Sequence, residues 1–161
     1  MTDNVIIIPT RLEALRLPNK PLKKINNKEM ILHVYEAAKK ANIGDVIVAS
    51  PNQQIFELIT SVKGICVKTK PDHQTGTDRI FEVYETFLKK KPKIIINLQG
   101  DMPNIDPSNI QMLSSYMKKN LCDIATLASK FTNEKEIENT NNVKVITKKA
   151  LSNNQFDEAI D

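Results

Sequence analysis

Four short, unbroken apolar runs constrain the fold of this sequence more than any other feature. They occupy residues 5–8, 46–48, 65–67 and 94–96. A strand that is buried on both faces has this pattern, whereas a half-exposed strand alternates apolar and polar residues. Because segments with helical periodicity separate the runs, the sequence predicts an α/β fold with a mostly parallel sheet and helices on both faces.

Apolar residues spaced three and four apart predict four helices. The first three cover residues 30–41, 55–62 and 80–88, and the fourth begins near Pro107 and extends to Met117. Glycines just beyond the first two helices, Gly44 and Gly64, are typical of helix ends. This alternation of strand and helix is typical of parallel sheets.

The last third of the chain is less regular. Residues 123–127 and 143–146 are weaker strand candidates, and few apolar residues follow them. We therefore expect residues 1–147 to form one α/β domain. Residues 148–161 are expected to form a polar tail or a short terminal helix.

Composition excludes several classes of protein. No apolar run approaches the roughly 20 residues of a membrane-spanning helix, so no membrane insertion is expected. The acidic N-terminus is unlike a secretory signal. Cys66 and Cys122 form no disulfide framework, and with His33 and His73 they lack the spacing of a zinc site. We expect a cytoplasmic protein with reduced thiols.

The net charge of +4 comes from 23 basic and 19 acidic residues, and all but three of the basic residues are lysines spread along the chain. The tightest lysine cluster, 89–91 with Lys93, ends a predicted helix, where cations complement the helix dipole. A surface that stacks nucleic-acid bases needs aromatic residues among its cations, and no aromatic residues lie among these lysines. We therefore expect a solvated basic face and no nucleic-acid partner.

The three arginines, Arg11, Arg16 and Arg79, point to a different kind of site. In a lysine-rich chain, arginine marks positions that need a planar donor for phosphate or carboxylate. Two of them share the proline-stiffened loop 9–22, where Lys20 adds a third cation. This loop can bind a polyphosphate through its side chains. The alternative is a surface loop that happens to be basic.

Three polar segments, 9–22, 73–79 and 99–101, border the predicted strands and helices. Open α/β sheets bind ligands beyond the carboxyl ends of their strands, where the strand order reverses. We expect the three segments to converge there into a pocket for a nucleoside triphosphate. With only four glycines, the chain contains neither the P-loop motif nor G-x-G-x-x-G, which excludes P-loop and dinucleotide-binding Rossmann enzymes.

Two of these segments offer further chemistry. Asp101, a carboxylate at a strand end, suits Mg²⁺ that bridges protein and phosphate oxygens. The alternative is a turn closed by a hydrogen bond from the aspartate side chain. Thr75 or Thr77 can cap the following helix, and Gly76 lets a base or ribose approach the backbone closely.

Four motifs together resemble the 3-deoxy-manno-octulosonate cytidylyltransferases. They are VIIIPTR (5–11), RLPNKPL (16–22), DHQTGTDR (72–79) and NLQGD (97–101), and the resemblance fades after residues 142–145. It covers about nine-tenths of the chain. It implies a GT-A-like, Rossmann-like nucleotidyltransferase fold and usually a homodimer. The implied enzyme joins CTP and an acidic sugar, releases pyrophosphate and serves lipopolysaccharide synthesis.

The resemblance also implies roles for residues of the three segments. Arg11 and Lys20 would hold the triphosphate with Arg16 nearby, and Asp101 would ligate Mg²⁺, which makes Arg11, Lys20 and Asp101 the expected catalytic residues. The turn of residues 74–76 would face the cytidine. The expected nucleotide-binding residues are Pro9, Thr10, Arg11, Arg16, Lys20, Gln74, Thr75, Gly76, Gln99 and Gly100.

The sequence departs from the family pattern in three respects. Asn19 stands where glycine is common, and Met102 stands where an acidic residue is common. Family chains also continue well beyond residue 161 with a second acidic metal ligand, much of the sugar pocket and much of the dimer contact. We therefore expect a C-terminally truncated member with a weakened homodimer.

These departures leave several interpretations open. One is an active cytidylyltransferase, for octulosonate or for another acidic sugar. A second is a truncated relative that binds CTP without catalysis. A third is an unrelated basic interaction module.

Overall fold

The computed structural model describes residues 3–13, 17–119, 122–149 and 156–159. Strands occur at all four apolar runs, and the four helices predicted from apolar spacing are present. In chain order the elements are β1 (Asn4–Pro9), η1 (Lys20–Leu22), β2 (Lys24–Ile25), β3 (Lys28–Glu29), α1 (Met30–Ala41), β4 (Asp45–Ser50), α2 (Gln53–Ser61), β5 (Ile65–Lys68), α3 (Gly76–Thr86), β6 (Ile94–Asn97), α4 (Pro107–Lys119) and α5 (Glu134–Glu138).

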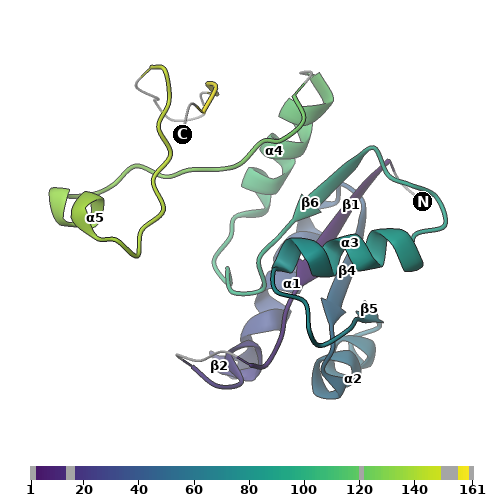
Figure 1. The fold of residues 1–161 in the computed structure, drawn as a ribbon. Coiled ribbons are helices and arrows are strands. Elements are labelled where there is room, and N and C mark those ends of the chain that lie inside the picture. The colour runs from purple at the N-terminus through teal and green to yellow at the C-terminus, as the bar shows by residue number, and fades with distance from the viewer. Residues whose placement is uncertain (1–2, 14–16, 120–121, 150–155, 160–161) are drawn as a thin grey trace. The chain divides into compact units, whose positions relative to one another are not determined.

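Four parallel strands form the central sheet in the order β5–β4–β1–β6 (Figure 1). The chain steps from β1 outward to β4 and β5, and it then returns to the other side of β1 to form β6. The strand order therefore reverses at β1. At this point Ile7 of β1 pairs with Asn97 at the end of β6. The carboxyl ends of β1 and β6 thus lie side by side and form the crevice in which open α/β sheets bind ligands.

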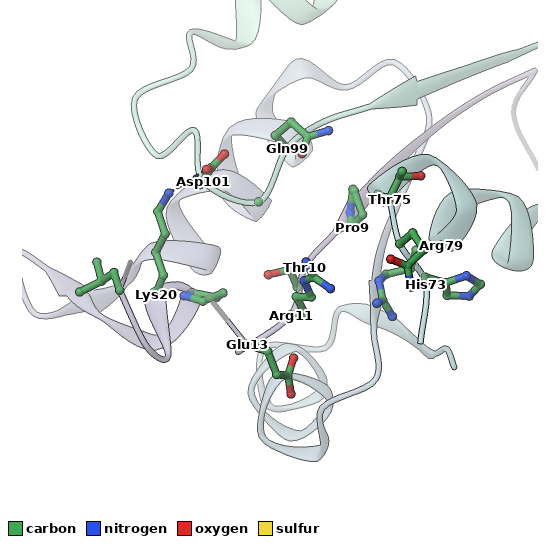
Figure 2. Close-up of a pocket in the computed structure, with 15 residues that line it drawn as sticks. Pro9, Thr10, Arg11, Glu13, Lys20, His73, Thr75, Arg79, Gln99 and Asp101 are labelled. Atoms are coloured by element: carbon green, nitrogen blue, oxygen red, sulfur yellow. Dashed lines mark hydrogen bonds and ion pairs between the residues drawn. The ribbon is translucent and has the colours of Figure 1, made fainter. Parts of the chain in front are cut away.

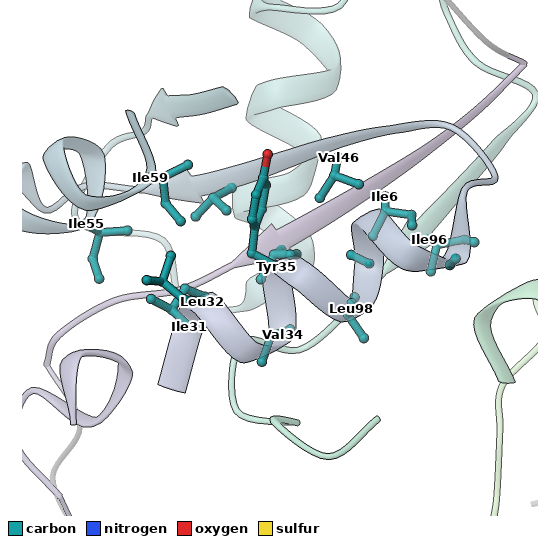
Figure 3. Packing of buried hydrophobic residues seen from close by; sticks show 14 of the residues in the cluster. Ile6, Ile31, Leu32, Val34, Tyr35, Val46, Ile55, Ile59, Ile96 and Leu98 are labelled. Atoms are coloured by element: carbon teal, nitrogen blue, oxygen red, sulfur yellow. The ribbon is translucent and has the colours of Figure 1, made fainter. Parts of the chain in front are cut away.

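Alternate residues of β1 pack on opposite faces of the sheet. Ile6 and Ile8 belong to a cluster with apolar residues of α1, α2 and α4 (Figure 3), whereas Val5 and Ile7 pack with residues of α3. None of these four side chains is more than 3% exposed. Burial of such a side chain is worth about 1.5–3 kcal/mol, so β1 is firmly anchored from both sides. The predicted fold class, a parallel sheet with helices on both faces, is confirmed.

The loop that follows β1 turns back toward the sheet through a left-handed residue. Asn19 has φ 57° and ψ 29°, a conformation that asparagine tolerates better than most residues with a side chain. The Leu22 N–H donates to the Asn19 carbonyl at 2.9 Å, and η1 carries Pro21 in its first turn. The substitution of asparagine for the glycine expected at residue 19 therefore preserves the turn that leads into Lys20.

The weaker strand candidates at 123–127 and 143–146 are wrong. Neither segment is a strand in the described structure. Ile124 is 88% exposed and Val143 is 90% exposed, so these apolar side chains are not buried against a neighbouring element. A strand needs a partner for its backbone hydrogen bonds, and in the described residues neither segment pairs with one of the sheet's strands.

The chain divides into two compact units, Met1–Ala125 and Thr126–Asp161. This division falls earlier than the boundary after residue 147 that the sequence suggests. The first unit contains the sheet and helices α1–α4. The second contains α5, which is capped by the Asn133 side chain, and its described residues include no buried side chain. Within the described part of the chain, no helix has the length and apolar character to cross a membrane.

Candidate functional site

A pocket of about 770 Å³ opens at the carboxyl ends of β1 and β6 (Figure 2). It lies within the first unit, and three segments far apart in the sequence line it, which confirms the expected convergence. The lining residues are Pro9, Thr10, Arg11, Glu13, Leu17, Lys20, Pro21, His73, Gln74, Thr75, Gly76, Arg79, Gln99, Gly100 and Asp101.

Ten of the eleven site residues predicted from the sequence line this pocket. The eleventh, Arg16, lies in the segment 14–16, outside the described residues. The structure thus brings together the residues that the sequence picked out, and the roles assigned to them stay predictions. Glu13, Leu17, Pro21, His73 and Arg79 also line the pocket and were not among the predicted site residues.

Two glycines let the three segments approach each other closely. A Cβ atom at Gly76 would lie 3.1 Å from Cγ of Pro9. A Cβ atom at Gly100 would lie 3.1 Å from Cβ of Thr10 and 3.2 Å from the Pro9 carbonyl oxygen. Contacts this short crowd a side chain. Glycine at both positions therefore lets the turns pack closely against the end of β1.

Lys20 and Asp101 form an ion pair across the pocket. Nζ of Lys20 lies 2.7 Å from Oδ2 of Asp101, and the two side chains point toward one another (Figure 2). They are 35% and 53% exposed. An ion pair this open to water contributes only about 0–1 kcal/mol, so a charged ligand can separate it at little cost.

The first turn of α3 is closed by a reciprocal cap. Oγ1 of Thr75 accepts a hydrogen bond from the Asp78 N–H at 3.1 Å, and Oδ2 of Asp78 accepts one from the Thr75 N–H at 3.1 Å. The hydrogen bonds from the Thr75 hydroxyl and backbone lower the pKa of Asp78. The cap fixes the turn that begins α3 at the pocket wall. Of the two caps considered from the sequence, Thr75 is the one used.

Arg79 is buried, with only 2% of the residue exposed. Nη1 donates to Oγ1 of Thr69 and, at 2.9 Å, to the Lys70 carbonyl oxygen. Burial, and then repulsion from the nearby Arg11 charge, lowers the pKa of Arg79. Its rarity in a lysine-rich sequence was the signal that marked it, and both of these hydrogen bonds go to the segment that precedes α3. It therefore supports the pocket wall.

Glu13 supplies a second carboxylate to the pocket lining. Its Oε1 accepts a hydrogen bond from Nδ2 of Asn52 at 2.9 Å. This hydrogen bond is the largest cause of the lowered pKa of Glu13, and the Arg11 charge contributes. Nothing in the sequence pattern singled out Glu13, because its place depends on the course of the loop after β1.

The charges of the pocket favour a phosphorylated ligand with an associated cation. Arg11 and Lys20 present positive charge, and Asp101 presents an accessible carboxylate. Among the described residues, no cluster of three or more His, Cys, Asp or Glu side chains forms a metal site of its own. A metal ion here would need oxygen atoms from a ligand in addition to Asp101.

Comparison with known proteins agrees with this picture. The family model for cytidylyltransferases matches residues 5–160. The chain belongs to the cytidylyltransferase family. A 3-deoxy-manno-octulosonate cytidylyltransferase of Bartonella henselae is 40% identical over 96% of this chain and 63% of its own length. One of Paramagnetospirillum magneticum is 38% identical over 88% of this chain and 58% of its own length.

A solved cytidylyltransferase structure, CMP:2-keto-3-deoxy-manno-octonic acid synthetase complexed with CTP, is similar in fold and sequence. It aligns with a TM-score of 0.68 at 40% identity and covers 73% of this chain and 48% of the solved chain. The present chain spans about 60% of the length of the curated relatives that it matches. The family and the nucleotidyltransferase fold expected from the sequence motifs are thereby confirmed.

Proposed function

We propose that this chain binds CTP in the pocket and carries the nucleotide-binding part of a 3-deoxy-manno-octulosonate cytidylyltransferase for lipopolysaccharide synthesis. The convergence of Arg11, Lys20, the 74–76 turn and Asp101 on one pocket is the observation that carries the proposal. The names of the relatives and the CTP in the similar solved structure support it.

The proposed reaction transfers a cytidylyl group. An oxygen of a sugar hydroxyl attacks the α-phosphorus of CTP, and the bond from that phosphorus to the bridging oxygen of the β-phosphate breaks. Pyrophosphate leaves with the bond's electron pair, and the hydroxyl proton is released. Such a reaction depends on positioning and on neutralising negative charge. Arg11 and Lys20 supply the positive charge for the triphosphate in this proposal.

Asp101 is the residue that would hold Mg²⁺. Its carboxylate is 53% exposed and faces the pocket, and Mg²⁺ is commonly bound by one or two carboxylates together with substrate phosphates and water. The residues therefore fit a metal shared between protein and nucleotide. When bound, the ion would neutralise phosphate charge. Lys20 would then exchange its contact with Asp101 for one with the phosphates.

The turn of residues 74–76 is proposed to face the cytidine. Gly76 lines the pocket, and the absence of a side chain there lets the turn pack against Pro9 at the end of β1. Gln74 adds an amide that can both donate and accept hydrogen bonds. We assign base recognition to this turn because the family resemblance implies it and because Arg11 and Lys20, the cations proposed to hold the triphosphate, lie on the 9–22 loop.

Location and assembly form part of the same proposal. Cys66 and Cys122 are free thiols, which suits a cytoplasmic protein. A homodimer is proposed by analogy with the family. Because the chain spans about 60% of its relatives, a second candidate is a protein that binds CTP without transferring the cytidylyl group. Transfer to a different acidic sugar is a third.

Two measurements on the full chain separate these candidates. Calorimetric titration with CTP and Mg²⁺ tests binding, and release of pyrophosphate on adding the octulosonate tests transfer. Binding with release supports the enzyme, and binding without release supports the non-catalytic candidate. Release with another acidic sugar alone would change the assigned acceptor. Absence of CTP binding would contradict the proposal in all these forms.

A further inference from the structure

The wall of the pocket that precedes α3 has little regular structure of its own. Residues 69–74 connect β5 to the cap of α3 without forming a helix or strand. The Thr69 N–H donates to the Ser50 carbonyl at 3.2 Å, which ties the start of the segment to β4. The residues after Thr69 are held by side-chain hydrogen bonds. The side chains involved are Arg79 and Glu82 of α3 and His73 of the segment itself.

Two charged residues of α3 bind the backbone of one residue in this segment. Oε2 of Glu82 accepts a hydrogen bond from the Lys70 N–H at 2.9 Å. Nη1 of Arg79 donates to the Lys70 carbonyl oxygen, also at 2.9 Å. Residues three apart lie on the same side of a helix, so the two side chains reach Lys70 together. Lys70 is thus held at both its donor and its acceptor.

The same carboxylate oxygen holds a second point of the segment. Nε2 of His73 lies 2.5 Å from Oε2 of Glu82, and their side chains are only 17% and 18% exposed. Figure 2 shows the His73 ring directed away from Arg11. His73 therefore fastens the segment to α3, and the next residue, Gln74, begins the turn proposed to face the cytidine.

Glu82 is ionised in this arrangement. Burial acts to raise the pKa of Glu82, but the hydrogen bonds from His73 and from the Lys70 N–H outweigh it, and the pKa lies below its ordinary value. A half-buried carboxylate with two donors at one oxygen is a firm anchor, because hydrogen bonds to a charged group are stronger than neutral ones.

We propose that Glu82 is a positioning residue for the nucleotide: by holding Lys70 and His73 it fixes the 74–76 turn in the conformation that binds CTP. Arg79 acts as the second anchor. The inference rests on the proposed CTP binding. If loss of Glu82 leaves the turn correctly placed about one-tenth of the time, the apparent affinity for CTP falls about tenfold.

Three variants of the full chain test the role of Glu82. Glu82→Ala removes the acceptor, whereas Glu82→Gln keeps an oxygen that can accept the same hydrogen bonds. Glu85→Ala is the matched control, because Glu85 is an exposed carboxylate on the same helix that pairs with Lys91 at 3.2 Å. Calorimetry with CTP and Mg²⁺ gives the dissociation constant and the fraction of binding-competent protein. Amide hydrogen exchange at Lys70 gives the order of the segment.

We expect Glu82→Ala to bind CTP about tenfold more weakly, with faster exchange at Lys70. Glu82→Gln should recover the affinity to within about threefold, and Glu85→Ala should match the unmodified chain. A purely structural role would lower the binding-competent fraction or the melting temperature and leave the dissociation constant unchanged. That outcome, or unchanged affinity in a folded Glu82→Ala variant, would overturn the inference while the proposed function stands.

His73→Ala provides a second route if Glu82→Ala does not fold. It removes one of the two donors to Glu82 and leaves the carboxylate, so we expect CTP to bind about threefold more weakly. Unchanged affinity in a folded His73→Ala variant would then overturn the inference. If the unmodified chain binds no CTP at all, the proposed function fails and this inference fails with it.

Discussion

Replacing Asp101 by asparagine separates the role of its charge from the stability of the fold. The ion pair with Lys20 is short, at 2.7 Å, but its side chains are 35% and 53% exposed. Such a pair contributes about 0–1 kcal/mol. In a protein of this size a loss of 1 kcal/mol lowers the melting temperature by about 2–4 °C. Asp101→Asn should therefore melt within about 4 °C of the unmodified chain.

Asp101→Asn should change the affinity for CTP in opposite directions with and without Mg²⁺. Without Mg²⁺, the Asp101 carboxylate repels the phosphates, and its removal should strengthen binding. For charges about 4 Å apart in water this repulsion is about 1 kcal/mol, which corresponds to about fivefold in affinity. With Mg²⁺, the unmodified chain should gain affinity because Asp101 becomes a ligand, and Asp101→Asn should lose that gain.

Calorimetric titration with CTP, once with excess Mg²⁺ and once with EDTA, measures both effects. Asp123→Asn is the control, because Asp123 is an exposed carboxylate outside the pocket lining. It should behave as the unmodified chain under both conditions. If Asp101→Asn responds to Mg²⁺ as strongly as the unmodified chain does, Asp101 is not the metal ligand and the reasoning is refuted.

Three further predictions concern the pocket and its support. Arg11→Ala should weaken CTP binding about 10- to 100-fold in calorimetry, as expected for loss of a charge-assisted contact, and leave the melting temperature nearly unchanged; equal affinity would contradict its role. Gly100→Ala should lower the unfolding free energy by about 1–3 kcal/mol in urea titration, because its Cβ meets the Pro9 carbonyl at 3.2 Å. The pKa of Glu82 in the folded protein lies below its ordinary value of 4.5. The contribution of Glu82 to stability is therefore present above pH 4.5 and is lost as the pH falls from 4.5 toward the folded-state pKa. The difference in unfolding free energy between Glu82→Gln and the unmodified chain should therefore shrink over that range, and a constant difference would argue against an ionised anchor.

The sheet could be predicted from the sequence because its signal is local. A run such as Val5–Ile8 has few alternatives to a strand buried on both faces, and the helical periodicity between runs is strong. The segments at 123–127 and 143–146 show the limit of this reasoning. Their apolar residues resemble those of strands, but a strand also needs a neighbour, and that requirement depends on the whole fold.

The part of the pocket that could be predicted from the sequence consists of charged and polar residues near the ends of the predicted strands. Arg11 and Asp101 are conspicuous because they closely follow apolar runs, and Lys20 is conspicuous because it shares the proline-stiffened loop with two arginines. Glu13 was not conspicuous, because it reaches the pocket through the path of a loop. The contacts of Glu82 were equally hidden, because a glutamate on a helix looks like any solvated charge until the tertiary structure brings a loop against it.

The two sides of the pocket differ in local stability, because the strands that carry them occupy different positions in the sheet. β1 is flanked by β4 and β6, whereas among the described strands β6 pairs only with β1. Residues that follow β6 are less protected against local unfolding than residues that follow β1, because opening at the edge of a sheet costs less free energy than global unfolding. Partial unfolding of this edge would displace the Asp101 carboxylate first, while the Arg11 guanidinium, which follows the central strand β1, would keep its position.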